Sequence, residues 1–212
     1  MKRCIIFGGG QIVDQRYARN LIDTEKDYII CADSGYSHCC AMGIVPQLVV
    51  GDFDSYRGDV SKKCELIRVE AEKNDTDTML AVKEALRRGY TEMILLGMTG
   101  GRMDHTLANI QTVVYAARAG ARAVIMDRDL VVCAICGPDS ITVAPKQRCT
   151  LSVFSHSDES HGVCIRGAKY PLEDATLTNT FPLGVSNAFL PGQTAQVSVE
   201  EGTLVILVNR DN

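Results

Sequence analysis

Residues 46–55 read Pro-Gln-Leu-Val-Val-Gly-Asp-Phe-Asp-Ser. The apolar run at 48–50 is typical of a short buried strand, which Gly51 would end. Asp52 and Asp54 follow, and in an extended chain their side chains would share one face, roughly 6–7 Å apart. Two negative charges at that distance repel and raise a pKa unless a cation neutralises them. Because Mg²⁺ prefers carboxylates, water and phosphate oxygens, the pattern indicates a metal–phosphate site.

The same two carboxylates have an interpretation that involves no chemistry. Asp54 or Ser55 could cap a helix that runs through Glu65, because short polar side chains accept hydrogen bonds from the first backbone N–H groups of a helix. On its own, a pair of Asp residues favours this helix cap. The choice therefore depends on whether the rest of the chain supplies the other parts of a phosphate site.

The first part of the chain alternates between predicted strands and predicted helices. Strands are predicted at residues 3–7, 28–32, 48–50, 66–69, 93–96 and 124–126. Helices are predicted at residues 12–21, between Gly35 and about Gly43, from 74–77 to Gly89, and at 103–119. This alternation is typical of a mostly parallel sheet with crossover helices on its faces. We therefore expect an α/β domain over residues 1–128.

The pattern changes from about Asp129 onward, where no amphipathic helix is predicted. Short alternating runs occur at residues 130–135, 141–143, 149–154, 163–165, 175–177, 195–199 and 204–208. Turn signals such as Gly-Pro, Pro-Gly and Glu-Gly separate them, which is typical of an antiparallel sandwich or barrel. The expected fold class is α/β, with an N-terminal mostly parallel sheet and flanking helices followed by an antiparallel β-sandwich over residues 129–212.

The composition narrows the class of protein. The 212 residues are 46% hydrophobic and 23% charged, which is typical of a globular chain. A formal net charge of −4 argues against nucleic acid as a partner, because a phosphate backbone calls for a basic surface. No run of about 18 apolar residues is long enough to span a membrane. The apolar run near the N-terminus is too short for a signal peptide.

Nine cysteines do not indicate a disulfide framework here. Their number is odd, the chain is not small, and several lie inside apolar strand patterns, where Cys acts as a small hydrophobic residue. The Cys-x-x-Cys spacing of Cys133 and Cys136 could form half a zinc site, but no second pair follows at the usual spacing. We therefore expect reduced cysteines and a cytoplasmic protein.

Four groups of Asp residues follow predicted parallel strands. They are Asp33, Asp52 with Asp54, Asp75 with Asp77, and Asp104. Each group could instead cap a helix or favour its first turn. Open α/β sheets bind ligands at the carboxyl ends of their strands, and all four groups occur there with none in mid-strand. Together they predict a metal–phosphate site.

Two glycine-rich turns could bind phosphate. Residues 8–10 are Gly-Gly-Gly after the first strand, but they lack the Gly-x-Gly-x-x-Gly spacing. Residues 97–102, Gly-Met-Thr-Gly-Gly-Arg, join a strand to a helix, so backbone N–H groups and the helix N-terminus can face an anion. Arg102 adds a bidentate cation, and Lys73 adds a second one beside the third acidic group. No Lys-Ser/Thr pair follows, so this turn is not a Walker A loop.

Six motifs occur in order along both parts of the chain. They are Ala-Asp-Ser-Gly at 32–35, Gly-Asp-Phe-Asp-Ser at 51–55, Lys-Asn-Asp-Thr-Asp at 73–77, Leu-Gly-Met-Thr-Gly-Gly-Arg-Met-Asp-His-Thr-Leu-Ala-Asn at 96–109, Tyr-Pro-Leu at 170–172 and Ser-Asn-Ala-Phe at 186–189. Together they resemble the thiamine pyrophosphokinase family. The resemblance covers almost the whole chain, and its motifs are far more specific than any one pair of Asp residues.

The resemblance implies an enzyme that transfers pyrophosphate from ATP to the hydroxyl of thiamine, giving thiamine diphosphate and AMP. It implies an N-terminal domain that binds ATP and Mg²⁺, a C-terminal sandwich that helps to bind thiamine, and a homodimer with thiamine near the subunit interface. No nucleic acid or membrane partner is expected. Two rivals stay open: another Mg²⁺-dependent phosphoryl or pyrophosphoryl transferase, and a non-catalytic sensor of thiamine or nucleotide.

The resemblance also assigns residues. The catalytic carboxylates are Asp33, Asp52, Asp54 and Asp77, of which Asp52, Asp54 and Asp77 are the metal ligands. The ATP-binding residues are Gly9, Lys73, Thr76, Thr99, Gly100, Gly101, Arg102 and Asp104. The thiamine-binding residues are Ser186 and Asn187. Either Asp52 or Asp33 accepts the hydroxyl proton of thiamine.

The chain departs from the family pattern at several positions. Many bacterial relatives have Asp where this chain has Asn74, and many have Glu where it has Ala188. The chain contains no Trp, so an indole cannot stack on thiamine as it does in some eukaryotic members. One of three residues could take that place: Tyr170, Phe181 or Phe189.

Overall fold

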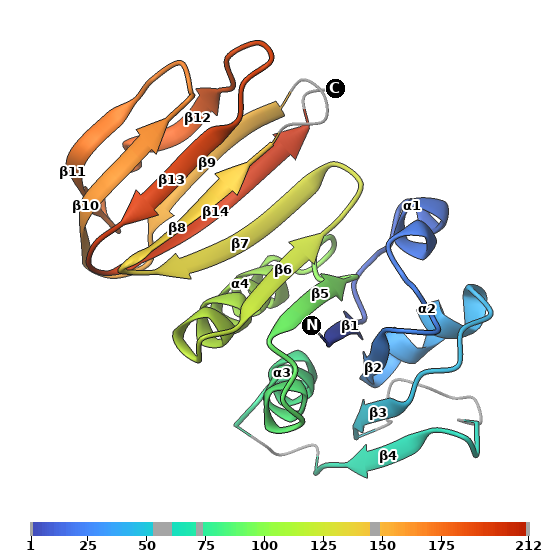
Figure 1. Cartoon of the computed structure of the whole chain (residues 1–212). Coiled ribbons are helices and arrows are strands. Elements are labelled where there is room, and N and C mark those ends of the chain that lie inside the picture. The colour runs from blue at the N-terminus through green and yellow to red at the C-terminus, as the bar shows by residue number, and fades with distance from the viewer. Residues whose placement is uncertain (1, 53–60, 71–73, 145–148, 211–212) are drawn as a thin grey trace. The chain divides into compact units, whose positions relative to one another are not determined.

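The computed structural model describes residues 2–52, 61–70, 74–144 and 149–210 (Figure 1). The chain forms two compact units, Met1–Arg128 and Asp129–Asn212. The first unit combines helices with a parallel sheet, and the second consists of antiparallel strands. The expected fold class, α/β followed by an antiparallel sandwich, is confirmed.

Six parallel strands form the sheet of the first unit. They are β1 (Arg3–Phe7), β2 (Tyr28–Ala32), β3 (Leu48–Gly51), β4 (Glu65–Arg68), β5 (Glu92–Leu96) and β6 (Arg122–Met126). Their order in space is β6-β5-β1-β2-β3-β4, and each neighbouring pair is parallel. From β1 the chain adds strands on one side as far as β4, and β5 then returns to the other side of β1. The carboxyl ends of β1 and β5 therefore flank the switch point where such sheets bind ligands.

Helices cover both faces of this sheet. They are α1 (Gln15–Asn20), the 3₁₀-helix η1 (Asp33–Gly35), α2 (Tyr36–Ala41), α3 (Asp77–Arg87) and α4 (Met103–Arg118). Side chains that alternate along the strands, such as Ile5, Ile29 and Val49, pack in one apolar core with residues of α1 and α2. Helix α3 contacts β1, β2 and β3, and α4 contacts α3 and β6. Figure 1 shows α3 and α4 on the side of the sheet away from α1 and α2.

The start of one helix differs from the sequence prediction for a local reason. Helix α1 begins at Gln15 and not at residue 12, because Asp14 caps it by accepting a backbone hydrogen bond from its first turn. Thr76, and not Asp75, caps α3 in the same way. Asp75, for which a helix cap was the alternative interpretation, accepts two hydrogen bonds from Lys83, at 2.9 and 2.7 Å.

The alternative helix through Glu65 does not extend over the described residues. Residues 61–64 include a turn, and Glu65 begins β4. Residues 53–60, which include the proposed caps Asp54 and Ser55, lie outside the described part of the chain.

Two antiparallel sheets form the second unit. One contains β7 (Leu130–Cys136), β9 (Cys149–Ser155), β12 (Gly184–Ala188) and β14 (Thr203–Arg210), in the order β12-β9-β14-β7. The other contains β8 (Asp139–Val143), β10 (Glu159–Arg166), β11 (Leu172–Thr178) and β13 (Ala195–Val199), in the order β11-β10-β13-β8. Fully buried side chains such as Leu151, Ile165 and Ile206 form its core. Strand β12 was not predicted from the sequence.

Two further properties concern the whole described part of the chain. No helix there is long and apolar enough to cross a membrane. All nine cysteines are free thiols. Burial raises the pKa of the Cys31 thiol well above its ordinary value, so this side chain behaves as a small apolar residue of the core.

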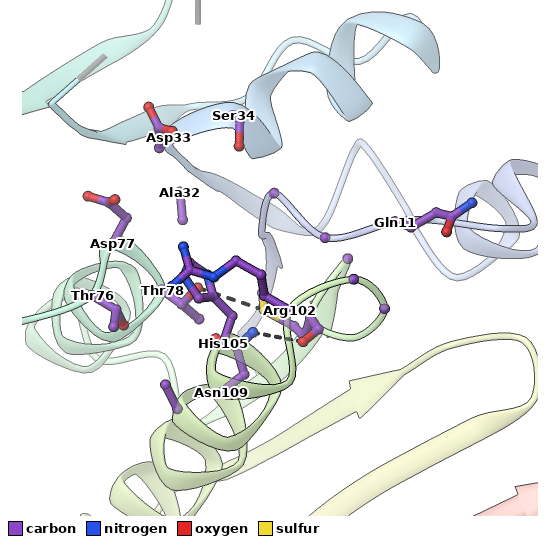
Figure 2. Close-up of a pocket in the computed structure, with 17 residues that line it drawn as sticks. Gln11, Ala32, Asp33, Ser34, Thr76, Asp77, Thr78, Arg102, His105 and Asn109 are labelled. Carbon is purple, nitrogen blue, oxygen red and sulfur yellow. Dashed lines mark hydrogen bonds between the residues drawn. The ribbon is translucent and has the colours of Figure 1, made fainter. Parts of the chain in front are cut away.

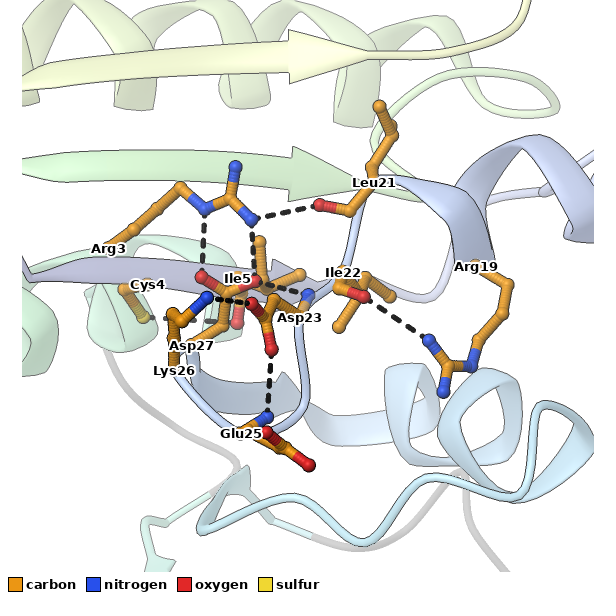
Figure 3. A network of polar contacts seen from close by, with 10 residues as sticks. All are labelled: Arg3, Cys4, Ile5, Arg19, Leu21, Ile22, Asp23, Glu25, Lys26 and Asp27. Carbon is orange, nitrogen blue, oxygen red and sulfur yellow. Dashed lines mark hydrogen bonds and ion pairs between the residues drawn. The ribbon is translucent and has the colours of Figure 1, made fainter.

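An ion pair between Arg3 and Asp27 links the start of β1 to the connection between α1 and β2 (Figure 3). The Nε and Nη2 atoms of Arg3 donate to the two carboxylate oxygens of Asp27 at 2.8 and 2.7 Å, and Nη2 also donates to the Leu21 carbonyl at 3.0 Å. The Asp27 carboxylate accepts a third hydrogen bond, from the backbone N–H of Asp23 at 2.7 Å. The Asp27 side chain is only 3% exposed, and its hydrogen bonds to Arg3 raise the pKa of Arg3.

Replacing Asp27 should destabilise the fold. We expect Asp27→Ala to lower the free energy of unfolding by about 2 to 4 kcal/mol, because Arg3 and the Asp23 N–H lose a buried, charged acceptor. Lys26→Ala is the matched control in the same loop, since Lys26 is 81% exposed and pairs only with the Asp23 carboxylate among the described residues. That control should change stability by less than about 1 kcal/mol. Urea unfolding followed by circular dichroism measures both, and equal effects would contradict the argument.

Candidate active site

A cavity of about 600 Å³ lies at the carboxyl ends of β1, β2 and β5 (Figure 2). Four segments line it: the turn after β1, the η1 turn after β2, the start of α3, and the turn from β5 into α4. The cavity thus occupies the switch point of the sheet, and both glycine-rich turns predicted from the sequence contribute to it.

The structure brings together only part of the predicted site. The predicted residues that line the cavity are Gly9, Asp33, Thr76, Asp77, Gly100, Gly101 and Arg102. Asp52, Thr99 and Asp104 are not among the residues that line it. Asp54 and Lys73 lie outside the described residues, and Ser186 and Asn187 belong to the second unit.

The two glycine-rich turns are joined by backbone hydrogen bonds. The N–H of Gly8 donates to the carbonyl of Leu96, and the N–H of Gly10 donates to the carbonyl of Gly97, both at 2.8 Å. Gly97 has φ = 67°, and a Cβ atom there would lie 2.7 Å from the Gly8 carbonyl oxygen. A side chain at Gly97 would therefore be strained by its backbone and would also push the turns apart.

Helix α4 holds the second turn from the other side. The Nδ2 of Asn109 donates to the carbonyl of Met98 at 2.7 Å, and the Asn109 side chain is largely buried. His105 also lines the cavity, one helical turn before Asn109. Sequence reasoning did not assign either residue to the site. The signal for them was their i, i+4 spacing on the first turns of a helix that follows a phosphate-binding turn.

Asp33 has the most unusual environment of the acidic residues in the cavity. Its backbone has φ = 43°, a conformation that non-glycine residues seldom adopt. The residue is 8% exposed, and its buried Oδ1 accepts no hydrogen bond from any described residue. A buried carboxylate oxygen without a partner is costly. Strain and burial of this kind are features of residues that a ligand or an ion completes.

The carboxylates of the cavity fit a magnesium ion. Asp33 and Asp77 line the same space from η1 and the first turn of α3, whereas Asp75 is neutralised by Lys83. The described residues contain no group of three His, Cys, Asp or Glu side chains that could hold a metal by itself. Mg²⁺ does not need one, because it is commonly bound by one or two carboxylates together with water and substrate phosphates. The unpartnered Oδ1 of Asp33 is the observation that favours a cation here.

Arg102 stands at the start of α4 and pairs with Asp104. Its Nε and Nη2 donate to the two carboxylate oxygens of Asp104, at 3.1 and 2.5 Å. These hydrogen bonds lower the pKa of Asp104 to about 2 and raise the pKa of Arg102. Both side chains are more than half exposed, so the pair contributes little to stability. An incoming phosphate can therefore compete with Asp104 for the guanidinium.

Ser186 and Asn187 of the second unit have different environments. Asn187 is buried, and its Oδ1 accepts hydrogen bonds from the N–H groups of Tyr170 and Ala188, both at 2.9 Å. Its Nδ2 donates to the Tyr170 carbonyl at 2.6 Å. Asn187 thus holds the backbone around Tyr170, whose ring is exposed. Ser186 is exposed and has φ = 56°, with its N–H donating to the Ser152 hydroxyl at 3.1 Å.

Family models match both units of the chain. Residues 19–125 match thiamin pyrophosphokinase, catalytic domain, and residues 140–204 match thiamin pyrophosphokinase, vitamin B1 binding domain. The chain belongs to the thiamin pyrophosphokinase family. It is therefore an enzyme, a transferase of the thiamine diphosphokinase class.

Individual relatives agree with this family. A thiamine pyrophosphokinase of Bacillus subtilis is 27% identical over 187 residues, which cover 86% of this chain and 87% of that protein. A crystal structure of thiamine pyrophosphokinase from Bacillus subtilis has a TM-score of 0.88 and 24% identity, with all of both chains covered. One from Geobacillus thermodenitrificans has a TM-score of 0.83 and 26% identity, with 99% of this chain and 98% of that chain covered.

Thiamin pyrophosphokinase activity should depend on Asp33 although stability should not. We expect Asp33→Asn to reduce thiamine diphosphate formation by at least about 100-fold. The free energy of unfolding should stay the same or rise by about 1 kcal/mol, because Asn tolerates positive φ and the substitution removes a buried charge.

The matched control is Asp174→Asn, the same substitution at φ = 48° on the exposed surface of the second unit. This control should leave the rate of thiamine diphosphate formation and the free energy of unfolding unchanged. Activity assays and thermal unfolding of the two variants make the comparison. An Asp33→Asn enzyme that keeps normal activity would remove Asp33 from the site.

Proposed function

We propose that the chain transfers a pyrophosphoryl group from ATP to the hydroxyl of thiamine, giving thiamine diphosphate and AMP. Family membership supports the formation of thiamine diphosphate. The observation that carries the finer proposal is the cavity at the carboxyl ends of β1, β2 and β5. There two interlocked glycine turns, the Arg102 guanidinium and the unpartnered Asp33 carboxylate line one space.

The nucleotide binds in this cavity. Backbone N–H groups of the glycine turns other than those of Gly8 and Gly10, together with the N-terminus of α4, provide donors for phosphate oxygens. Arg102 supplies a cationic fork once a phosphate replaces Asp104 as its partner. The proposed ATP-binding residues are Gly9, Lys73, Thr76, Thr99, Gly100, Gly101 and Arg102, with Asp104 holding the Arg102 guanidinium before ATP binds.

Mg²⁺ is the cofactor that the donor set fits best. We propose that Asp77, which lines the cavity, would hold it together with Asp52 at the end of β3, Asp54 outside the described residues, water and phosphate oxygens. The ion supplies positive charge that stabilises the charge developing on the phosphates. A cation in this position would also complete the environment of the buried Asp33 oxygen.

The transfer is an in-line displacement at the β-phosphorus of ATP. The hydroxyl oxygen of thiamine forms a bond to the β-phosphorus, the bond from that phosphorus to the bridging oxygen of the α-phosphate breaks, and AMP leaves with this oxygen. Asp33 or Asp52 accepts the hydroxyl proton, and Arg102 offsets negative charge on the phosphates. Both carboxylates follow adjacent strands, β2 and β3, so each can lie near the attacking hydroxyl.

The second unit contributes the thiamine contacts. Ser186 binds thiamine through its exposed hydroxyl, and Asn187 acts by holding the backbone of Tyr170. Large apolar side chains are exposed in this unit: Tyr170, Phe181, Leu183 and Val185. Such side chains support the proposals that the unit binds the thiamine rings and that two copies form a homodimer. A cytoplasmic location is part of the same proposal and rests on the free cysteines.

The nucleotide product tests the proposed reaction. Incubation with ATP, Mg²⁺ and thiamine should give AMP and thiamine diphosphate in equal amounts, because the attack on the β-phosphorus breaks the bond between the α- and β-phosphates. Chromatography of the products measures this ratio. ADP with thiamine monophosphate would identify a γ-phosphoryl transferase on the same scaffold, and binding without turnover would identify a sensor.

The assembly and the thiamine contacts have their own test. We expect light scattering of the active enzyme to give the mass of a dimer. We expect Ser186→Ala to raise the KM for thiamine about 10-fold, because one hydrogen bond to the ligand is lost. The KM for ATP should stay unchanged. Ser140→Ala, at an exposed strand position of the same unit, is the control. An active monomer would exclude the dimer, and an unchanged KM for thiamine would exclude the Ser186 contact.

A further inference from the structure

His38 connects α2 to the first glycine turn. Its Nε2 lies 2.8 Å from the carbonyl oxygen of Gly10, a residue that lines the cavity. A carbonyl oxygen can only accept, so Nε2 carries the proton and donates it. His38 is not one of the residues lining the cavity. We propose that His38 is a positioning residue, which holds the turn at residues 8–10 in the conformation that binds ATP; this rests on the proposed function.

Gly10 is the point where three segments meet. Its N–H donates to the Gly97 carbonyl at 2.8 Å, which ties it to the turn after β5. Its carbonyl accepts from His38, which ties it to α2. Both peptide groups that flank the Gly10 Cα are therefore fixed from opposite sides, one by the second glycine turn and one by an imidazole. The His38 contact is the only one of the two made by a side chain, so it can be removed without changing the backbone sequence of either turn.

The start of α2 explains why His38 reaches this turn. A Cβ atom on Gly35 would collide with the Phe7 carbonyl oxygen, so the absence of a side chain lets η1 pack directly on the end of β1. The Ser37 hydroxyl then donates to the Ser34 carbonyl at 2.7 Å and closes the first turn. His38 follows in α2 and is half-buried, with its ring over the turn that leaves β1.

Three consecutive glycines need an external restraint more than other sequences do. Gly-Gly-Gly has more accessible backbone conformations than any other tripeptide, so ordering it on ligand binding is costly in conformational entropy. A donor that fixes the Gly10 carbonyl bears part of that cost before the nucleotide arrives. Loss of the donor should therefore weaken nucleotide binding and have little effect on the chemical step or on thiamine.

The experiment compares His38→Leu, which removes the donor, with His38→Gln, whose amide nitrogen has about the reach of Nε2. We expect His38→Leu to weaken binding of ATP with Mg²⁺, measured by calorimetry, roughly 10-fold. The KM for ATP should rise by a similar factor, while kcat and the KM for thiamine stay within about 2-fold. His38→Gln should bind within about 3-fold of the wild type. His161→Leu, at a partly exposed histidine of the second unit, is the control and should change nothing.

Three results would overturn the proposal: His38→Leu with wild-type affinity, His38→Gln as weak as His38→Leu, or an equal rise in the KM for thiamine. If His38→Leu does not fold, His38→Asn replaces it, because its shorter amide does not reach the Gly10 carbonyl. Equal ATP affinity of the Asn and Gln variants would then count against the proposal. A wild type that binds ATP but forms no thiamine diphosphate refutes the proposed reaction, and the calorimetric comparison at His38 still decides this inference.

Discussion

The hydrogen bond from the Gly10 N–H to the Gly97 carbonyl is the contact on which the candidate active site depends. It joins the turns that leave β1 and β5, the two neighbouring strands between which the strand order reverses. Because neither turn has room for a side chain at this contact, the turns stay close enough for one cavity to include both. Separation of the turns would divide the lining of the cavity to which both contribute.

Asp33 lowers the stability of the first unit, and the core of that unit offsets the loss. A positive φ and a buried carboxylate oxygen without a hydrogen-bond partner each cost on the order of 1–3 kcal/mol. The core of the parallel sheet offsets this cost, since strands such as β1 and β2 bury nearly all of their side chains. The fold therefore tolerates an unfavourable residue in the lining of the cavity.

The sequence predicted most strands because their apolar runs decide their positions, and the predicted and observed bounds of β1 and β2 agree. It failed at β12, where Ser186 has a positive φ and the pairing with β9 changes register, so neither apolar alternation nor strand propensity marked the segment. The acidic groups were predicted to follow the strands. The family resemblance named Asp77 and not Asp75, and Asp77 lines the cavity whereas Asp75 pairs with Lys83. The sequence pattern alone did not separate the two, because the Lys83 contact depends on the fold.

Neighbouring polar residues in the sequence motifs have different functions: one is placed to contact a ligand, and the other holds the backbone in position. A side chain that contacts a ligand must be held within a fraction of an ångström, so another polar group has to fix the backbone that carries it. Asn187 is fully engaged with the backbone of Tyr170, while the adjacent Ser186 is exposed. His38 stands in the same relation to Gly10, although it lies in α2 and Gly10 lies in the turn after β1. A short motif therefore contains both contacts and supports, and a support outside the motif is invisible until the fold brings it to the turn that it holds.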